Sequence, residues 1–285
     1  MNTPRLKDIS YYPGCSLAST ATENNQSLLA LCRKMGLNLV ELEDWNCCGS
    51  SSANALNEDL ALDLAARNLF KAPPDRPLLV ACPNCILRLR SANLELRNNE
   101  IKRYQYEKKW GLPFNTDLKI LHFFELFNDV HLPDLQGRAG VSLEGLKFAP
   151  YYGCMLSRPN TLKDVQNYHG LMEAILTSLG ASPIAWNNSS RCCGTFLAVT
   201  KPEITTKIVN RIMEDAIDAG ADCLVTACAM CHLNLEIRCG LQNPLPTMHF
   251  SELLSLSLGV RDHGDWFSKH LVDPRPLLKR KALLR

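Results

Sequence analysis

The sequence has no apolar run that approaches the roughly 18 consecutive residues needed to cross a membrane. Its first residues, MNTPRLKDIS, lack the apolar core of a secretory signal peptide. The formal net charge is only +2, so no excess of basic residues indicates nucleic-acid binding. Together these absences predict a cytoplasmic protein without a membrane span or a nucleic-acid partner.

Two common cofactor motifs are also missing from the sequence. No G-x-G-x-x-G segment follows a predicted strand, which argues against a bound flavin dinucleotide. No C-x2-C-x2-C-x3-C run of the bacterial ferredoxin type is present. If the chain carries out redox chemistry, its electrons must enter from another polypeptide, and we therefore expect one subunit of a complex.

Cysteine, in contrast, is abundant, with 13 residues in a chain of 285. Disulfides are rare in a reducing compartment, where clustered thiols more often bind metal or carry out redox chemistry. The composition, 46% hydrophobic and 21% charged, is that of an ordinary globular protein. The length favours about two domains.

The cysteine motifs occur twice in the same order, at offsets between 139 and 146 residues. The three pairs are YYPGC at 11–15 and YYGC at 151–154, CCG at 47–49 and at 192–194, and CPNC at 82–85 and CAMC at 228–231. Chance could supply one such pair but not this ordered series. The sequence therefore predicts a duplicated unit of about 140 residues.

Each half alternates short apolar runs with amphipathic segments, which predicts an α/β fold of two pseudo-symmetric repeats, each a small parallel sheet with flanking helices. Strands are expected near 9–12, 38–42, 78–81, 118–121, 147–152, 182–186 and 223–227. Helices are expected near 24–35, 58–71, 86–108, 163–179 and 203–219. We expect Asn57 to cap the second of these helices and Leu60 to lie on its apolar face. The expected units are a first cysteine-rich domain at 1–135, a second at 146–260, and a C-terminal tail at 261–285 that packs on the body.

The paired and spaced cysteines all follow predicted strands, and the carboxyl ends of parallel strands meet at one edge of a sheet. The first cysteine set is Cys15, Cys47, Cys48, Cys82 and Cys85, and the second cysteine set is Cys154, Cys192, Cys193, Cys228 and Cys231. Thiolates suit both iron–sulfur clusters and zinc, but an ordinary site of either kind uses about four protein ligands, one fewer than each half offers. Buried apolar cysteines, structural zinc and disulfides remain alternatives.

Three further cysteines and two glycines also carry expectations. Cys32, Cys223 and Cys239 have no counterpart in the other half and are expected to be buried apolar residues. Gly49 and Gly194 follow the adjacent cysteines and would let the backbone approach a bulky cluster.

Two similar segments, LHFFEL at 121–126 and MHFSEL at 248–253, each carry a histidine followed three residues later by glutamate. For His122 and His249 we favour helix capping or packing over a catalytic role, with Glu125 and Glu252 as capping partners. The longer spacing before His122 indicates an insertion in the first half, within the charged stretch near 95–117.

The doubled pattern, from YYPGC at 11 to HLVDPRPLL at 270–278, resembles the cysteine-rich CCG domains of the family formed by the B subunits of heterodisulfide reductases. The resemblance implies that all five cysteines of each set hold a noncubane 4Fe-4S cluster, which accounts for the surplus thiol. It implies two such clusters, with the ten cysteines as metal ligands and no motif cysteine missing.

The resemblance further implies an oxidoreductase acting on sulfur groups, the iron–sulfur catalytic subunit of a complex that reduces a small disulfide to two thiols or runs the reverse reaction. The implied partners are a ferredoxin-like iron–sulfur subunit and a flavin-containing subunit. Relatives in sulfur-oxidising and succinate or fumarate dehydrogenase-like complexes leave an electron-transfer role as the alternative.

Overall fold

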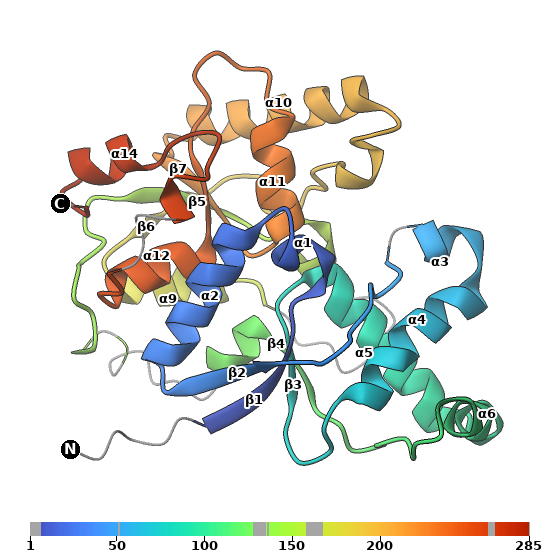
Figure 1. The fold of residues 1–285 in the computed structure, drawn as a ribbon. Coiled ribbons are helices and arrows are strands. Elements are labelled where there is room, and N and C mark those ends of the chain that lie inside the picture. Colours follow the sequence, from blue (N-terminus) through green and yellow to red (C-terminus); the bar gives the residue numbers. More distant parts are fainter. Residues whose placement is uncertain are drawn as a thin grey trace, which may run out of the picture.

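The computed structural model describes residues 7–50, 52–127, 135, 137–157, 168–261 and 266–284. Two four-stranded parallel sheets form its framework, with helices packed around them (Figure 1). The strand order is β2-β1-β3-β4 in the first sheet and β6-β5-β7-β8 in the second. The two orders correspond strand by strand, so the predicted α/β fold of two repeats is confirmed.

The first half contains eleven described elements. In chain order they are β1 (Lys7–Tyr12), α1 (Gly14–Ala18), α2 (Thr22–Lys34), β2 (Leu37–Glu41), α3 (Ser52–Leu56), α4 (Glu58–Lys71), β3 (Leu78–Val80), α5 (Pro83–Asn98), α6 (Glu100–Trp110), β4 (Ile120–His122) and the 3-10 helix η1 (Phe123–Phe127).

The second half repeats this plan, and its described elements end with a helix of the tail. They are β5 (Lys147–Tyr151), α8 (Gly153–Ser157), α9 (Leu171–Ser178), β6 (Ser182–Pro183), the 3-10 helix η2 (Thr195–Leu197), α10 (Pro202–Asp218), β7 (Cys223–Thr226), α11 (Ala229–Ile237), β8 (Thr247–His249), α12 (Phe250–Ser257) and α14 (Arg275–Arg280).

The helix expected over 86–108 is two helices, α5 and α6. The break falls at Asn99, whose side chain accepts a hydrogen bond from Lys102 N and so starts a new helix. Among the described residues, no helix lies between α11 and β8, so α6 is the predicted insertion. The helix expected over 163–179 begins, as far as it is described, at Leu171, and residues 163–167 lie outside the described residues.

Helix α4 has the predicted bounds, and Asn57 caps it by accepting a hydrogen bond from Leu60 N at 2.9 Å. The prediction that Leu60 faces the core is wrong, because its side chain is 46% exposed. Ala61, Ala65 and Leu69 are buried instead, since residues four apart share one face of a helix. Small side chains on this face let α4 pack closely against α5.

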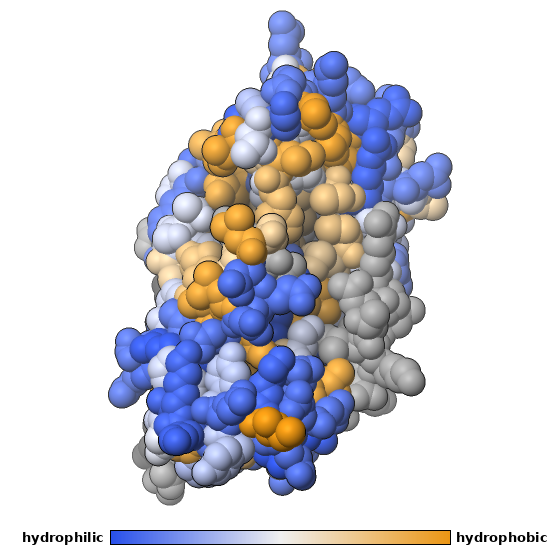
Figure 2. Space-filling view, turned by 90° about the vertical axis from the view of Figure 1, so that its right-hand side faces the viewer, coloured by the Kyte–Doolittle hydropathy of each residue, from blue (hydrophilic) through white to orange (hydrophobic). Residues whose placement is uncertain are grey.

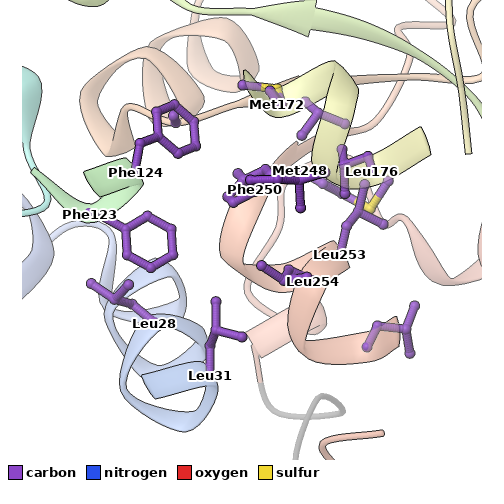
Figure 3. Close-up of a cluster of buried hydrophobic side chains, with 14 of the residues drawn as sticks. Leu28, Leu31, Phe123, Phe124, Met172, Leu176, Met248, Phe250, Leu253 and Leu254 are labelled. Carbon is purple, nitrogen blue, oxygen red and sulfur yellow. The ribbon is translucent and has the colours of Figure 1, made fainter. Parts of the chain in front are cut away.

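The two halves share one apolar core, shown in Figure 3. Leu28 of α2 and Phe124 of η1 come from the first half, while Met172 of α9 and Phe250 of α12 come from the second. The rings of Phe124 and Phe250 meet edge to face, 5.0 Å between centroids. Each such buried side chain contributes about 1.5–3 kcal/mol, so the core holds the halves in one relative position.

The tail packs on the body, as expected, over the residues that the structure describes. Trp266 and Phe267 are buried in the shared core, and so is Leu278 of α14. Lys281 forms an ion pair with Asp222 at 2.7 Å and donates to the carbonyl of Gly145 at 2.8 Å. Within the described ranges, no helix has the length and apolar character that a membrane span requires.

Candidate metal centres

The carboxyl ends of the parallel strands gather the cysteines of each set. In the first half, β1 leads into the short helix that carries Cys15, and β3 leads into Cys82, the N-cap residue of α5. Cys228 holds the same N-cap position on α11 in the second half. A helix N-terminus favours a negatively charged group, so both positions suit a metal-binding sulfur.

The first cysteine set forms a continuous group of thiols. The sulfurs of Cys48 and Cys85 are 3.2 Å apart, Cys85 also interacts with Cys82, and Cys47 interacts with both Cys15 and Cys48. Cys15 and Cys47 are exposed, whereas the other three cysteines are buried. The group therefore has an open side and a closed side.

The second cysteine set has the same arrangement. The sulfurs of Cys193 and Cys231 are 3.4 Å apart, Cys231 also interacts with Cys228, and Cys154 interacts with Cys192. These separations greatly exceed the S–S bond length of about 2.05 Å, and all thirteen cysteines are free thiols. The structure thus brings together all ten cysteines that the sequence singled out, five in each half.

Mutual contact drives the pKa values of these thiols apart. Contact with Cys15 and Cys48 lowers the pKa of Cys47 to about 2, while contact with Cys47 raises the pKa of Cys48 to about 12. Contact with Cys47, together with burial, also raises the pKa of Cys15. Adjacent thiolates repel one another, so a set this compact cannot ionise fully without a positive charge beside it. Five converging soft donors with this need suit bound iron better than an isolated redox thiol.

Two glycines for which the sequence predicted no role make room for the sulfurs. A Cβ atom on Gly14 would lie 3.0 Å from the sulfur of Cys85, and one on Gly153 would lie 3.2 Å from that of Cys231. Both glycines have positive φ angles, +71° and +66°. The signal was present in the sequence, since each precedes the first cysteine of its set.

Gly49 and Gly194 follow the adjacent cysteines, and the backbone N–H of Gly194 donates to the sulfur of Cys192 at 3.4 Å. Both have positive φ angles, +75° and +77°, which favour glycine. A Cβ atom there would meet Leu64 of α4 or Ile208 of α10, at 3.2 and 3.3 Å, and no sulfur lies among its nearest neighbours. The missing side chain thus fits each loop against the helix behind it, while the backbone N–H of each glycine contacts a cysteine of its set.

Tyrosines hold the loops that carry the adjacent cysteines. The hydroxyl of Tyr12 donates to the carbonyl of Asn46 at 2.8 Å, and that of Tyr151 donates to the carbonyl of Arg191 at 2.6 Å. Tyr12 packs edge to face on Trp45, with 5.5 Å between the ring centroids. The same tyrosine thus braces the same loop in each half.

The first half also forms a wall of the second centre. A small cavity beside the second cysteine set is lined by Pro83 and Asn84, the two residues inside the first CxxC motif. The Asn84 amide nitrogen lies 3.6 Å from the sulfur of Met230, which sits inside the other CxxC motif. The two motifs therefore meet at the boundary between the halves, a juxtaposition that spacing along the sequence does not reveal.

His122 and His249 have the capping role that the sequence favoured. Nδ1 of His122 accepts a hydrogen bond from Phe124 N at 3.2 Å, and His249 caps α12 in a reciprocal capping box with Glu252. Glu125 accepts from His122 N at 2.9 Å in the same way. Burial lowers the pKa of His122 to about 3 and that of His249 to about 4, so both rings are neutral at physiological pH.

The three remaining cysteines lie apart from the two sets. Cys32 and Cys223 are fully buried in the shared apolar core, and Cys239 is partly buried against the core of the second half. Burial raises the pKa of Cys32 to about 12, which keeps it a neutral thiol. They are apolar packing residues, as expected.

Comparison with known proteins gives matches over both halves. The cysteine-rich domain family, CCG, matches residues 9–90 and 148–236. The 8-methylmenaquinol:fumarate reductase membrane anchor subunit of Wolinella succinogenes is 28% identical over 284 residues, covering 95% of this chain and 99% of that protein. The B subunit of the ferredoxin/F(420)H(2)-dependent CoB-CoM heterodisulfide reductase of Methanosarcina acetivorans is 24% identical over 273 residues, covering 89% of this chain and 90% of that protein.

A solved structure supports the fold alone. A hypothetical protein from Helicobacter pylori superposes with a TM-score of 0.73 at 16% identity. The match covers 95% of this chain, which spans about half, 52%, of the length of that chain.

Proposed function

This chain belongs to the CCG cysteine-rich domain family, and from that premise we propose that it is the iron–sulfur catalytic subunit of a heterodisulfide reductase-like complex. It is distantly related to the B subunit of heterodisulfide reductase and to a fumarate reductase subunit. The observation that carries the proposal is the convergence of five thiols in each half, complete in both. The proposed cofactors are two noncubane 4Fe-4S clusters.

In this proposal the first cysteine set holds one cluster and the second cysteine set holds the other. When bound, such clusters supply single electrons and iron atoms that can take a sulfur ligand. Conversion of a disulfide to two thiols consumes two electrons and two protons. The contact between Asn84 and Met230, one from each CxxC motif, supports two centres that lie on either side of the boundary between the halves. That arrangement suits a substrate with two sulfurs.

The surface near the centres also suits binding of a substrate or partner. Leu56 and Val199, each a few residues beyond the adjacent cysteines of its half, are 81% and 88% exposed, and Phe196, which lines the cavity, is 47% exposed. Figure 2 shows apolar surface gathered around a hollow on the side of the molecule that carries α3, α4 and α10. The proposed partners are a ferredoxin-like iron–sulfur subunit and a flavin-containing subunit of a cytoplasmic complex.

Anaerobic purification and iron analysis test the cofactor. About eight irons per chain are expected for two four-iron clusters. The Cys239→Ser variant, which alters a thiol outside both sets, should keep the full iron content. Fewer than about four irons after careful reconstitution would contradict the proposal.

Substrate chemistry is tested separately, with the chain in its native complex. Adding a small disulfide to the reduced complex should change the electron paramagnetic resonance spectrum of the clusters and release thiol.

A second candidate function is electron transfer within a fumarate reductase-like complex. It is favoured by the relative that covers 95% of this chain, the 8-methylmenaquinol:fumarate reductase subunit. Clusters that are reduced by a quinol and left unchanged by every disulfide would support this alternative.

A further inference from the structure

A second group of metal-binding side chains lies behind the second cysteine set. The histidine–glutamate cluster consists of His232 and Glu236 on α11 and His270 of the tail. The three side chains are 2%, 5% and 0% exposed. Neither the proposed function nor the apolar core accounts for three buried metal-binding groups at one point.

The spacing of the donor atoms matches that of a tetrahedral zinc site. Oε1 of Glu236 lies 3.5 Å from Nε2 of His232 and 3.2 Å from Nδ1 of His270. Zinc bonds of about 2.0–2.1 Å place neighbouring tetrahedral ligands about 3.3 Å apart. All three donor atoms lie within 4.8 Å of one another.

Nε2 of His232 is the atom that most favours a metal ligand role at this point. This nitrogen is buried and makes no hydrogen bond within the described structure. An unpaired buried nitrogen costs about 1–3 kcal/mol, whereas a metal ion would satisfy it.

Each candidate ligand also makes a hydrogen bond through its other polar atom, as zinc ligands usually do. The other nitrogen of His232, Nδ1, lies 3.0 Å from Oδ1 of Asn24, a residue of the first half. The other nitrogen of His270, Nε2, lies 2.9 Å from Oε1 of Glu252. Glu236 accepts a hydrogen bond from the backbone N–H of Leu271 through its second oxygen, at 3.0 Å. These contacts leave Nε2 of His232 and Nδ1 of His270 directed at the carboxylate between them.

The charge balance also calls for a cation. Glu236 and Glu252 are two buried carboxylates, and Glu23 is a third that interacts with the same histidines. In the described structure the nearby bases are imidazoles, since no lysine or arginine pairs with these acids. In the first half, at the position equivalent to Glu236, stands Arg90, which supplies the positive charge covalently.

We propose that His232 Nε2, His270 Nδ1 and Glu236 Oε1 bind a zinc ion, with Asn24 and Glu252 as supporting hydrogen-bond partners. The ion fastens the tail to α11, one helical turn beyond the second CxxC motif. This proposal is independent of the proposed function, because its ligands are not cysteines.

Zinc X-ray absorption on the anaerobically purified full chain tests the proposal without any variant. The expected spectrum has nitrogen and oxygen ligands at about 2.0–2.2 Å, with about one zinc per chain. Sulfur ligands at about 2.3 Å would place the zinc in a cysteine set and overturn the proposal. A chain that takes up no zinc when grown with it and dialysed would overturn it equally, leaving an imidazolium held between two carboxylates.

Variants then separate this site from the cysteine sets. His232→Ala and His270→Ala should each lose the zinc and retain the iron, while Cys154→Ser should lose iron and retain zinc. His249→Asn is the matched control, because it removes a neighbouring buried imidazole but keeps a side chain that can cap α12. Zinc retained by both histidine-to-alanine variants, or lost only together with the iron, would contradict the assignment.

Discussion

The two halves carry the same five thiols on the same edge of equivalent sheets, yet the buried glutamates behind those thiols are neutralised in different ways. In the first half, the Glu125 carboxylate accepts hydrogen bonds from Arg90 and from the hydroxyl of Tyr168, each at 2.8 Å. In the second half, Glu252 pairs with His270 of the tail. Glu236 occupies the position that corresponds to Arg90 of the first half. Duplication has preserved the thiols while their surroundings have diverged.

The partners of these glutamates also cross between the halves. Tyr168 comes from the second half but pairs with Glu125 of the first, and Asn24 comes from the first half but pairs with His232 of the second. Each half therefore completes the polar network of the other. The side chains around each cysteine set therefore come from both repeats.

Replacing one central thiol in each half is the strongest way to test their equivalence. Cys85→Ser and Cys231→Ser each remove a buried sulfur that contacts two others of its set. Each variant is expected to keep about half of the iron, about four atoms per chain, and to lose the response to disulfide. Iron analysis and electron paramagnetic resonance provide the measurement. If one variant lost all its iron while the other variant lost only half, filling of one centre would depend on filling of the other.

Removing the cation of the first half tests how far the two polar networks differ. Arg90→Met keeps the apolar stem but leaves Glu125, 9% exposed at its side chain, without its charge partner. Because an unpaired buried charge is costly, the free energy of unfolding should fall by about 3 kcal/mol, measured by denaturant titration. Arg33→Met, on the exposed end of α2, should change it by less than about 0.5 kcal/mol.

The double variant Arg90→Met with Glu125→Gln completes this test. Removing both charges should recover part of the lost stability, since no buried charge then remains unpaired. A loss of under about 1 kcal/mol in Arg90→Met would mean that Tyr168 alone suffices to hold Glu125, and the electrostatic contrast between the halves would then be small.

The glycines beside the sulfurs give a smaller and more local effect. Gly14→Ala would force a left-handed backbone on alanine, at about 1–2 kcal/mol, and place a methyl group 3.0 Å from the sulfur of Cys85. Gly153→Ala should act in the same way on Cys231, where the gap is 3.2 Å. Both variants are expected to bind less iron than the unmodified chain. Gly14→Ala should bind the least, because its methyl group lies closer to the sulfur.

Gly111→Ala is the matched control for these variants. Its φ of +66° carries the same backbone strain, but nothing lies within 4 Å of the added methyl group. It should lose comparable stability and keep its iron. Equal iron loss in all three variants would show that strain, and not crowding of the sulfur, is responsible.

The sequence predicted every described strand except β8, half of the twelve described α-helices and the ten clustered cysteines, because these depend on local periodicity and on the meeting of strand ends. It missed the contact of Asn84 with Met230 and the pairing of His270 with Glu252, which depend on how two repeats and a tail pack together. No spacing rule connects such residues, since they lie on separate elements. The exposure of Leu60 was also not predicted. Helix α4 has more apolar residues than buried positions, so the sequence alone does not show which of them face the core.

The insertion of the first half gives the smallest expected effect. Helix α6 contributes no buried residue and begins at the Asn99 cap, 3.0 Å from Lys102 N. Asn99→Ala should weaken that helix by about 1 kcal/mol, which corresponds to roughly a fivefold faster amide hydrogen exchange along α6. Because α6 has no counterpart in the second half, iron content and global stability should stay unchanged.

Asn57→Ala provides the comparison for this last variant. It removes the equivalent cap from α4, whose buried face packs beside the first cysteine set. A loss of about 1 kcal/mol there should appear in global unfolding, because α4 does not open separately from the core. If Asn99→Ala also lowered global stability or iron content, α6 would belong to the core of the first half, and the insertion would be part of the difference between the two metal centres.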